Sequence, residues 1–120
     1  MAAAKYRLDN LLAIIDYNNL QLDGTCQEVM PIEPLADKWR AFNWEVFECD
    51  GHDFVSITRA LSDAEAVTGK PAIVLCHTTK GKGIPYIENY PTKPNILLTD
   101  DKYAECLAHL DAVEQELRNG

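Results

Sequence analysis

The chain has 120 residues, of which 47% are hydrophobic, and this length and composition fit one small globular domain. Its formal net charge of -8 excludes an extended nucleic-acid surface, because phosphate binding needs clustered cations. No window approaches the roughly 20 apolar residues of a membrane span, and the N-terminus lacks a signal-peptide pattern, so we expect a cytoplasmic protein without membrane contact. The four cysteines form no CxxC pair, which predicts reduced, mostly structural thiols.

The first part of the sequence alternates between helix and strand patterns. Residues 2–9 have a helix-forming composition. The apolar run at 11–15 is typical of a strand that is covered on both faces, as in parallel sheets. After two prolines that break the next segment, apolar residues recur at helical spacing and predict a helix over 34–43. Residues 44–49 alternate between apolar and polar and predict a second strand.

The second part continues the alternation. Asp53 can cap a helix that carries one apolar stripe. A buried strand is expected over 72–79, an irregular arm over 84–99 and a final helix over 100–118. The order strand, helix, strand, helix, strand, helix predicts an α/β fold with a parallel sheet and helices on both faces.

Two polar loops follow apolar strands and are candidates for a binding site. The segments "DYNN" at 16–19 and "HTTKGKG" at 77–83 would open at the same edge of a parallel sheet, where ligands bind. Asparagine offers a carbonyl oxygen that suits divalent cations, and glycines beside Lys80 and Lys82 suit a phosphate. The alternatives are that the asparagines are only turn residues and that "KGKG" is a solvated turn.

The histidines and tryptophans have both structural and functional interpretations. His52 lies beside two carboxylates, and a structural role in a strand-to-helix turn is favoured over metal binding. His77 ends a predicted buried strand and is either a hydrogen-bonded core histidine or a cofactor contact. Trp39 and Trp44 are expected in the core or in a subunit interface.

Taken together, "KYRLDNLLAIIDYNNLQLDG", "WEVFECDGHDF" and "GKPAIVLCHTTKGKG" resemble the amino-terminal, thiamine diphosphate-binding part of transketolase. The similarity covers about residues 1–90 and is closest to split or short transketolases, in which this section is a separate chain. The resemblance implies an incomplete thiamine diphosphate-binding fold. Residues 1–120 would form part of the diphosphate-side domain, and the Gly-Asp-Gly start of the family's cofactor motif would lie upstream of Met1.

The resemblance also implies roles for individual residues. Asn18 matches the asparagine that ends the cofactor motif, so its side-chain oxygen would coordinate the Mg²⁺ or Ca²⁺ that holds the cofactor diphosphate. The backbone carbonyl of Leu20 would join it as a second metal ligand. Leu22 would pack near the thiazolium ring, and Lys80 would stand in a loop close to the cofactor.

For function, the resemblance implies thiamine diphosphate-dependent transfer of a two-carbon ketol unit between sugar phosphates. The family's acidic metal ligand, its substrate histidines and its pyrimidine-binding half have no match in this sequence. We therefore expect the chain to be inactive alone and to act in a homo- or hetero-oligomer with a pyrimidine-binding section or subunit. Two alternatives are a non-catalytic remnant or interaction module, and a fragment of a 1-deoxy-D-xylulose-5-phosphate synthase.

Overall fold

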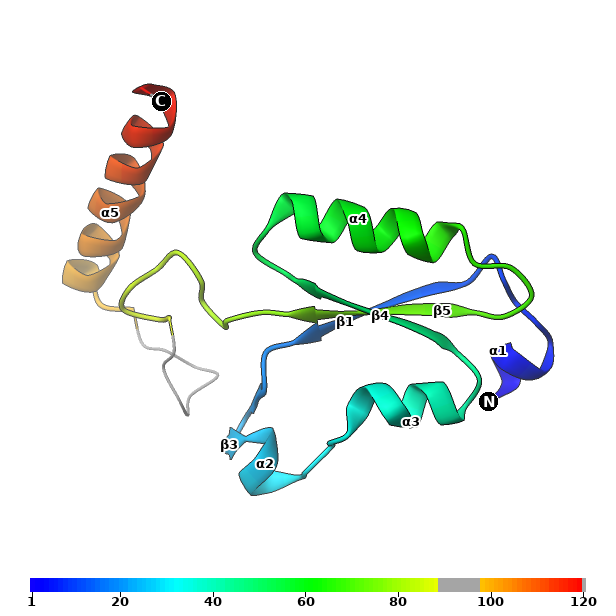
Figure 1. Ribbon diagram of the computed structural model, residues 1–120. Helices are drawn as coiled ribbons and strands as arrows, with labels where there is room; N and C mark the ends of the chain where they lie inside the picture. Colours follow the sequence, from blue (N-terminus) through cyan, green and yellow to red (C-terminus); the bar gives the residue numbers. More distant parts are fainter. Residues whose placement is uncertain (89–97, 120) are drawn as a thin grey trace. The chain divides into compact units, whose positions relative to one another are not determined.

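The computed structural model describes residues 1–88 and 98–119 of the chain (Figure 1). The chain divides into two compact units. The first, the sheet unit, consists of residues 1–19 and 30–78. The second, the hairpin unit, consists of residues 20–29 and 79–120.

A parallel sheet is the centre of the sheet unit. Strands β1 (Leu12–Tyr17), β5 (Ala72–His77) and β4 (Glu45–Asp50) lie in the order β1-β5-β4, and both pairings are parallel. The central position of β5 explains its composition, since Ala72, Ile73, Val74 and Leu75 are each at most 3% exposed. The predicted α/β class with a parallel sheet is therefore confirmed.

Helices cover both faces of this sheet (Figure 1). Helix α4 (Phe54–Glu65) packs on one face, and α1 (Ala2–Lys5) and α3 (Leu35–Ala41) contribute to the core of the other. Side chains alternate between the two faces of a strand, so neighbouring residues of β5 enter different cores. The α4 core is formed by Cys49, Ala60, Ala64, Ala72 and Val74. The α3 core is formed by Trp44, Ile73 and Leu75, with Trp39 packed against them.

Local interactions explain how α4 and α3 begin and end. The Asp53 carboxylate accepts hydrogen bonds from the backbone N–H groups of Val55 and Ser56, both at 3.1 Å, which confirms the predicted cap. After α3, the chain turns so that Trp44 packs edge-on against Trp39, with 5.1 Å between ring centroids. Trp44 is buried, which confirms the expectation that it belongs to the core.

The first two elements differ in length from the sequence-based expectation. Helix α1 ends at Lys5 instead of continuing to residue 9, because Arg7 has a left-handed backbone with φ of 51°. The Asp9 carboxylate instead accepts a hydrogen bond from Gly69 N at 2.9 Å. Strand β1 continues two residues beyond its apolar run, since Asp16 and Tyr17 remain paired with β5. Polarity therefore did not mark the end of this strand.

The hairpin unit contains short elements in addition to those predicted from the sequence. Strands β2 (Leu20–Gln21) and β3 (Gly24–Thr25) pair antiparallel, and α2 (Cys26–Val29) follows them directly. Glu28 Oε2 accepts hydrogen bonds from Thr25 N at 3.0 Å and Thr25 Oγ1 at 2.8 Å, while Glu28 N donates to Thr25 Oγ1. These contacts form a capping box, and the Thr25 backbone hydrogen bond lowers the pKa of Glu28.

The C-terminal part of the hairpin unit consists mainly of one helix. Helix α5 spans Asp100–Asn119, where the sequence predicts a helix over 100–118. Most of the predicted arm at 84–99 lies outside the described residues, which resume at Leu98. Within the described ranges, no helix combines the length and apolar character needed to cross a bilayer.

The buried thiol of Cys49 gives the sheet unit a testable dependence on alkaline pH. Burial, followed by the hydrogen bond with Cys76, raises the pKa of Cys49 from 9.0 to about 11. The unfolded chain releases this proton above about pH 9, whereas the folded chain retains it, so folding stability falls between these two pKa values. We expect this group to remove about 2 to 3 kcal/mol of unfolding free energy between about pH 9 and pH 11.

Urea denaturation of the wild-type chain and of Cys49→Ala at pH 8 to 11 measures this contribution. Because lysines and tyrosines titrate in both proteins, the informative quantity is the difference between the two stability curves. We expect the wild type to lose more stability than the variant as the pH rises. Parallel curves would contradict the assigned pKa.

Candidate cofactor site

The carboxyl ends of β1 and β5 bring three polar side chains together. The Thr78 hydroxyl donates to Asp16 Oδ1, and the backbone N–H of Thr78 donates to the Tyr17 carbonyl at 3.3 Å. Asn18 Nδ2 donates to Asp16 Oδ2 at 3.4 Å. A carboxylate only accepts hydrogen bonds, so Asp16 orients the Asn18 amide with its nitrogen toward Asp16 and its carbonyl oxygen away from it. The sequence places Asp16 and Thr78 in the two candidate loops, but it predicts an individual role only for Asn18.

The two consecutive asparagines have different backbone roles. Asn19 has φ of 58°, a left-handed conformation that asparagine tolerates better than most residues. Asn18 is not among the non-glycine residues with positive φ that the structure describes, which are Arg7, Asn19 and Asn43. The turn interpretation therefore applies to Asn19, whereas the side chain of Asn18 requires a separate explanation.

The next two predicted site residues belong to the hairpin unit. Leu20 is the first residue of β2 and pairs with Thr25 of β3. Leu22 lies in the two-residue connection between these strands, and its side chain is 59% exposed. An exposed leucine at a hairpin tip offers apolar surface, which is compatible with the predicted contact to an aromatic ring.

His77 lies at the end of β5 but is not a core histidine. Its side chain is exposed, and Nε2 lies 2.9 Å from Glu48 Oε2 on β4. Arg40 Nη2 approaches the other oxygen of Glu48 at 3.7 Å, and the Tyr17 ring meets the His77 ring edge-on at 5.2 Å between centroids. Because the carboxylate is an acceptor, Nε2 must carry the proton, and in a neutral imidazole Nδ1 is then an acceptor. The core-histidine interpretation was therefore wrong.

The two lysines of the glycine-rich loop after β5 differ in their ion-pair partners. Lys82 Nζ lies 2.9 Å from Glu88 Oε1, and Gly83 N donates to Glu88 Oε2 at 3.2 Å. Among the residues that the structure describes, no carboxylate forms an ion pair with Lys80. Gly81 has φ of 73°, and a Cβ there would lie 2.5 Å from Ile87 Cγ2, so glycine is required at this turn. Lys80 is thus the cation of this loop that could attract a phosphate.

The "DGHD" segment connects β4 to α4 beside the end of β5. Gly51 N donates to the His77 carbonyl at 2.8 Å, and a Cβ on Gly51 would lie only 2.4 Å from Thr78 Cγ2. The glycine therefore permits close approach of the two strand ends. The backbone N–H of His52 donates to Asp50 Oδ1 at 2.9 Å, which agrees with the expected structural role in this turn.

The donor chemistry at the end of β1 fits a hard cation only in part. Amide and backbone carbonyl oxygens are suitable ligands for Mg²⁺ or Ca²⁺, but such ions take about six or more ligands. Within residues 1–88 and 98–119, no group of three or more His, Cys, Asp and Glu residues could hold a metal ion. The remaining oxygens would have to come from a bound diphosphate, from water or from another polypeptide segment.

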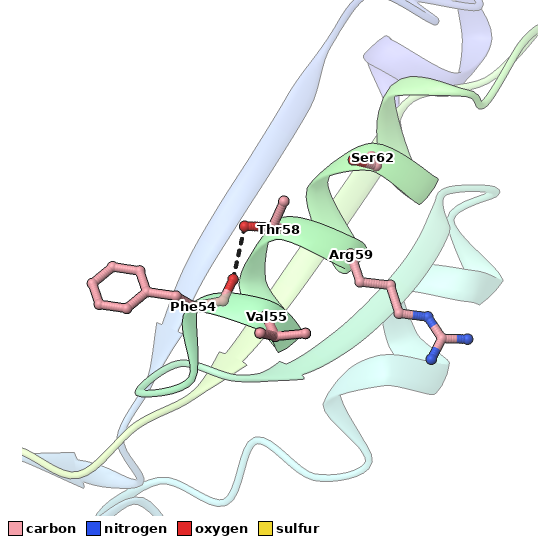
Figure 2. A pocket seen from close by; sticks show the side chains of 5 residues that line it. All are labelled: Phe54, Val55, Thr58, Arg59 and Ser62. Carbon is pink, nitrogen blue, oxygen red and sulfur yellow. Dashed lines mark hydrogen bonds between the residues drawn. The ribbon is translucent and has the colours of Figure 1, made fainter. Parts of the chain in front are cut away.

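A surface hollow lies elsewhere, on the outer surface of α4. It has a volume of about 440 Å³ and is lined by Phe54, Val55, Thr58, Arg59 and Ser62 (Figure 2). Figure 2 shows the Phe54 ring projecting away from the helix, while the Thr58 hydroxyl donates to the Phe54 carbonyl at 2.7 Å. None of the predicted cofactor residues lines this hollow, so it is not the predicted cofactor site.

A parallel α/β sheet with polar side chains at its carboxyl edge has the general arrangement of a ligand-binding α/β domain. Residues 1–110 match the family model described as transketolase, thiamine diphosphate binding domain. The chain therefore belongs to the transketolase family.

Curated relatives agree with this assignment. The chain is 43% identical to the 6-deoxy-6-sulfo-D-fructose transketolase subunit SqwG of Clostridium sp. (strain MSTE9), over 92% of this chain and 40% of the relative. It is 41% identical to an apulose-4-phosphate transketolase subunit of Phocaeicola vulgatus, over 89% of this chain and 38% of the relative. The chain thus spans about two fifths of the length of these relatives.

Solved structures support the fold. Transketolase from Campylobacter jejuni matches 98% of this chain and 22% of its own, with a TM-score of 0.70 and 22% identity. Transketolase from Pichia stipitis, in complex with sedoheptulose-7-phosphate, matches 72% of this chain and 13% of its own, with a TM-score of 0.66 and 30% identity.

Proposed function

We propose that this chain supplies the diphosphate and metal side of the cofactor site in a transketolase that transfers two-carbon ketol units between sugar phosphates. The observation that carries the proposal is the position of Asn18, immediately after β1 and hydrogen-bonded to Asp16, in a chain of the transketolase family. The family assignment supports thiamine diphosphate as the cofactor.

The proposed metal site uses oxygen atoms close together in the sequence. The Asn18 side-chain oxygen and the Leu20 backbone carbonyl, two residues further on, would each coordinate Mg²⁺ or Ca²⁺. The hydrogen bond from Asn18 Nδ2 to Asp16 supports this role, because it directs the amide nitrogen away from the cation. Asp16 is thus a positioning residue in this proposal.

The proposed cofactor contacts use one apolar and two polar side chains. Leu22 would pack near the thiazolium ring, Lys80 would attract the diphosphate, and His77 would present Nδ1 to a hydrogen-bond donor of the cofactor. The bound cofactor would serve as the electron sink for a ketose-derived carbanion. The residues of this chain would bind and orient it.

The printed names of the relatives support a subunit role. Both SqwG and the apulose-4-phosphate protein are named as transketolase subunits. We therefore propose that this chain is inactive alone, and that it acts in a homo- or hetero-oligomer with a pyrimidine-binding section or subunit. The family assignment does not favour the alternatives of a non-catalytic module or a deoxyxylulose phosphate synthase fragment.

Reconstitution tests this function. The chain is assayed alone and with a pyrimidine-binding transketolase subunit co-expressed from the same genome, using xylulose-5-phosphate as donor and ribose-5-phosphate as acceptor. We expect no turnover by the chain alone, and turnover by the pair that requires thiamine diphosphate and is lost when EDTA removes the divalent cation.

Two other results of these assays would support one of the alternative functions. A stable pair that fails to bind thiamine diphosphate in a calorimetric titration would contradict the proposal and indicate an interaction module. Consumption of pyruvate without ketol transfer from xylulose-5-phosphate would instead indicate a deoxyxylulose phosphate synthase activity.

A further inference from the structure

Two cysteines that are far apart in the sequence are in contact in the sheet. Cys49 of β4 and Cys76 of β5 occupy paired positions of the parallel register, and their Sγ atoms lie 3.5 Å apart. Both thiols are free, as are Cys26 and Cys106. The pair lies on the α4 face, where Cys76 packs against the core cluster that includes Cys49.

The geometry of this pair suits a covalent bond. Neighbouring strands lie about 4.8 Å apart, within the Cα separations of about 4.4 to 6.8 Å that disulfides span. The two sulfur atoms already touch, so closing the bond requires them to approach from 3.5 Å to a bonded distance without a change in register. Neither cysteine has a role in the proposed cofactor site.

We propose that Cys49 and Cys76 form an oxidation site, which a peroxide converts into an intramolecular disulfide between β4 and β5. This oxidation site is independent of the proposed enzymatic function. A disulfide here would tie the two strands together one residue before Asp50 and His77, at the carboxyl edge of the sheet.

The two sulfur atoms have different access to an oxidant. Cys49 is 5% exposed, whereas Cys76 is only partly buried, so the peroxide reaches Cys76 first. The Cys76 thiolate attacks one peroxide oxygen, which forms a sulfenic acid and releases hydroxide as the O–O bond breaks. The Cys49 thiolate then attacks the Cys76 sulfur and displaces a second hydroxide. With hydrogen peroxide, two thiols and one peroxide give one disulfide and two water molecules.

The alternative is that both cysteines only fill space in the core. Burial raises the pKa of Cys49 and keeps its thiolate scarce near neutral pH, which protects the pair from external electrophiles. Direct sulfur contact offsets this scarcity for an internal reaction, because the attacking group is already held against its target. Oxidation with hydrogen peroxide therefore distinguishes a reactive pair from inert core residues.

Peptide mapping of the full chain provides the test. Trypsin cuts after Arg40, Arg59 and Lys80, while Pro71 blocks cleavage after Lys70, so Cys49 and Cys76 fall in separate peptides, 41–59 and 60–80. The native chain is treated with hydrogen peroxide, alkylated with iodoacetamide in denaturant and digested without reductant. We expect a cross-linked pair of these two peptides, which dithiothreitol separates again.

Matched variants show whether the cross-link joins Cys49 and Cys76 specifically. The double variant Cys26→Ser/Cys106→Ser should still form the cross-link, and its intact mass should decrease by the mass of two hydrogen atoms on oxidation. The Cys76→Ser variant should not form the cross-link. Peroxide treatment in urea should give mixed pairings of the four cysteines instead of this one. The proposal is overturned if the native chain, or the folded double variant, is oxidised by peroxide without cross-linking peptides 41–59 and 60–80.

Discussion

Asn18→Ala is expected to lower the affinity of the assembled enzyme for Mg²⁺ by at least about 100-fold and to weaken thiamine diphosphate binding with it. The substitution removes a proposed metal ligand while leaving the backbone after β1 unchanged, because Asn18 does not require a left-handed conformation. Loss of the amide also leaves Asp16 with its hydrogen bond from Thr78. Calorimetric titration of thiamine diphosphate at several Mg²⁺ concentrations measures the effect.

Asn19→Gly is the matched control for this variant. Glycine adopts the left-handed backbone of Asn19, with φ of 58°, without steric cost, so the turn after β1 should be preserved. We expect this control to retain cofactor affinity within a few-fold of the wild type. Equal losses of affinity in both variants would show that cofactor binding depends on the conformation of the turn. Unchanged affinity of a folded Asn18→Ala protein would contradict metal coordination by Asn18.

The different roles of Asn18 and Asn19 could not be predicted from the sequence. The residue type predicted both a turn and an oxygen ligand, and nothing in "DYNN" assigns one property to each residue. Backbone conformation assigns the turn to Asn19. The polarity of Asp16 suggests a position beyond the strand, whereas Asp16 is paired within β1 and accepts a hydrogen bond from Asn18, a contact that the sequence does not predict.

Long-range contacts were the other part of the site that sequence patterns could not supply. Glu48 and His77 are 29 residues apart, and their contact depends on β4 lying next to β5. The alternating pattern at 44–49 and the apolar run from residue 72 predicted these two strands, but the order β1-β5-β4 results from tertiary packing. By contrast, the short helix α2 had a local signal, because Thr25 and Glu28 have the spacing of a capping box.

The central position of β5 predicts the largest single effect on stability. Ile73 is 0% exposed and lies in the core between the sheet and α3. Ile73→Ala is expected to cost about 3 to 5 kcal/mol of unfolding free energy, because it removes buried apolar atoms and leaves a cavity that the surrounding strands cannot close. Urea denaturation followed by circular dichroism measures this loss.

Ile14→Ala provides a matched control with the same chemical change. Ile14 pairs with Val74 in the register, but its side chain is 59% exposed, since it belongs to the outer strand β1. Removing atoms that are already in contact with water should cost less than about 1 kcal/mol. A large difference between the two variants supports the observed strand order, because only a central β5 makes Ile73 the more costly position. Equal losses would instead mean that Ile14 is covered in solution, so that β1 has an additional neighbour on its α4 face.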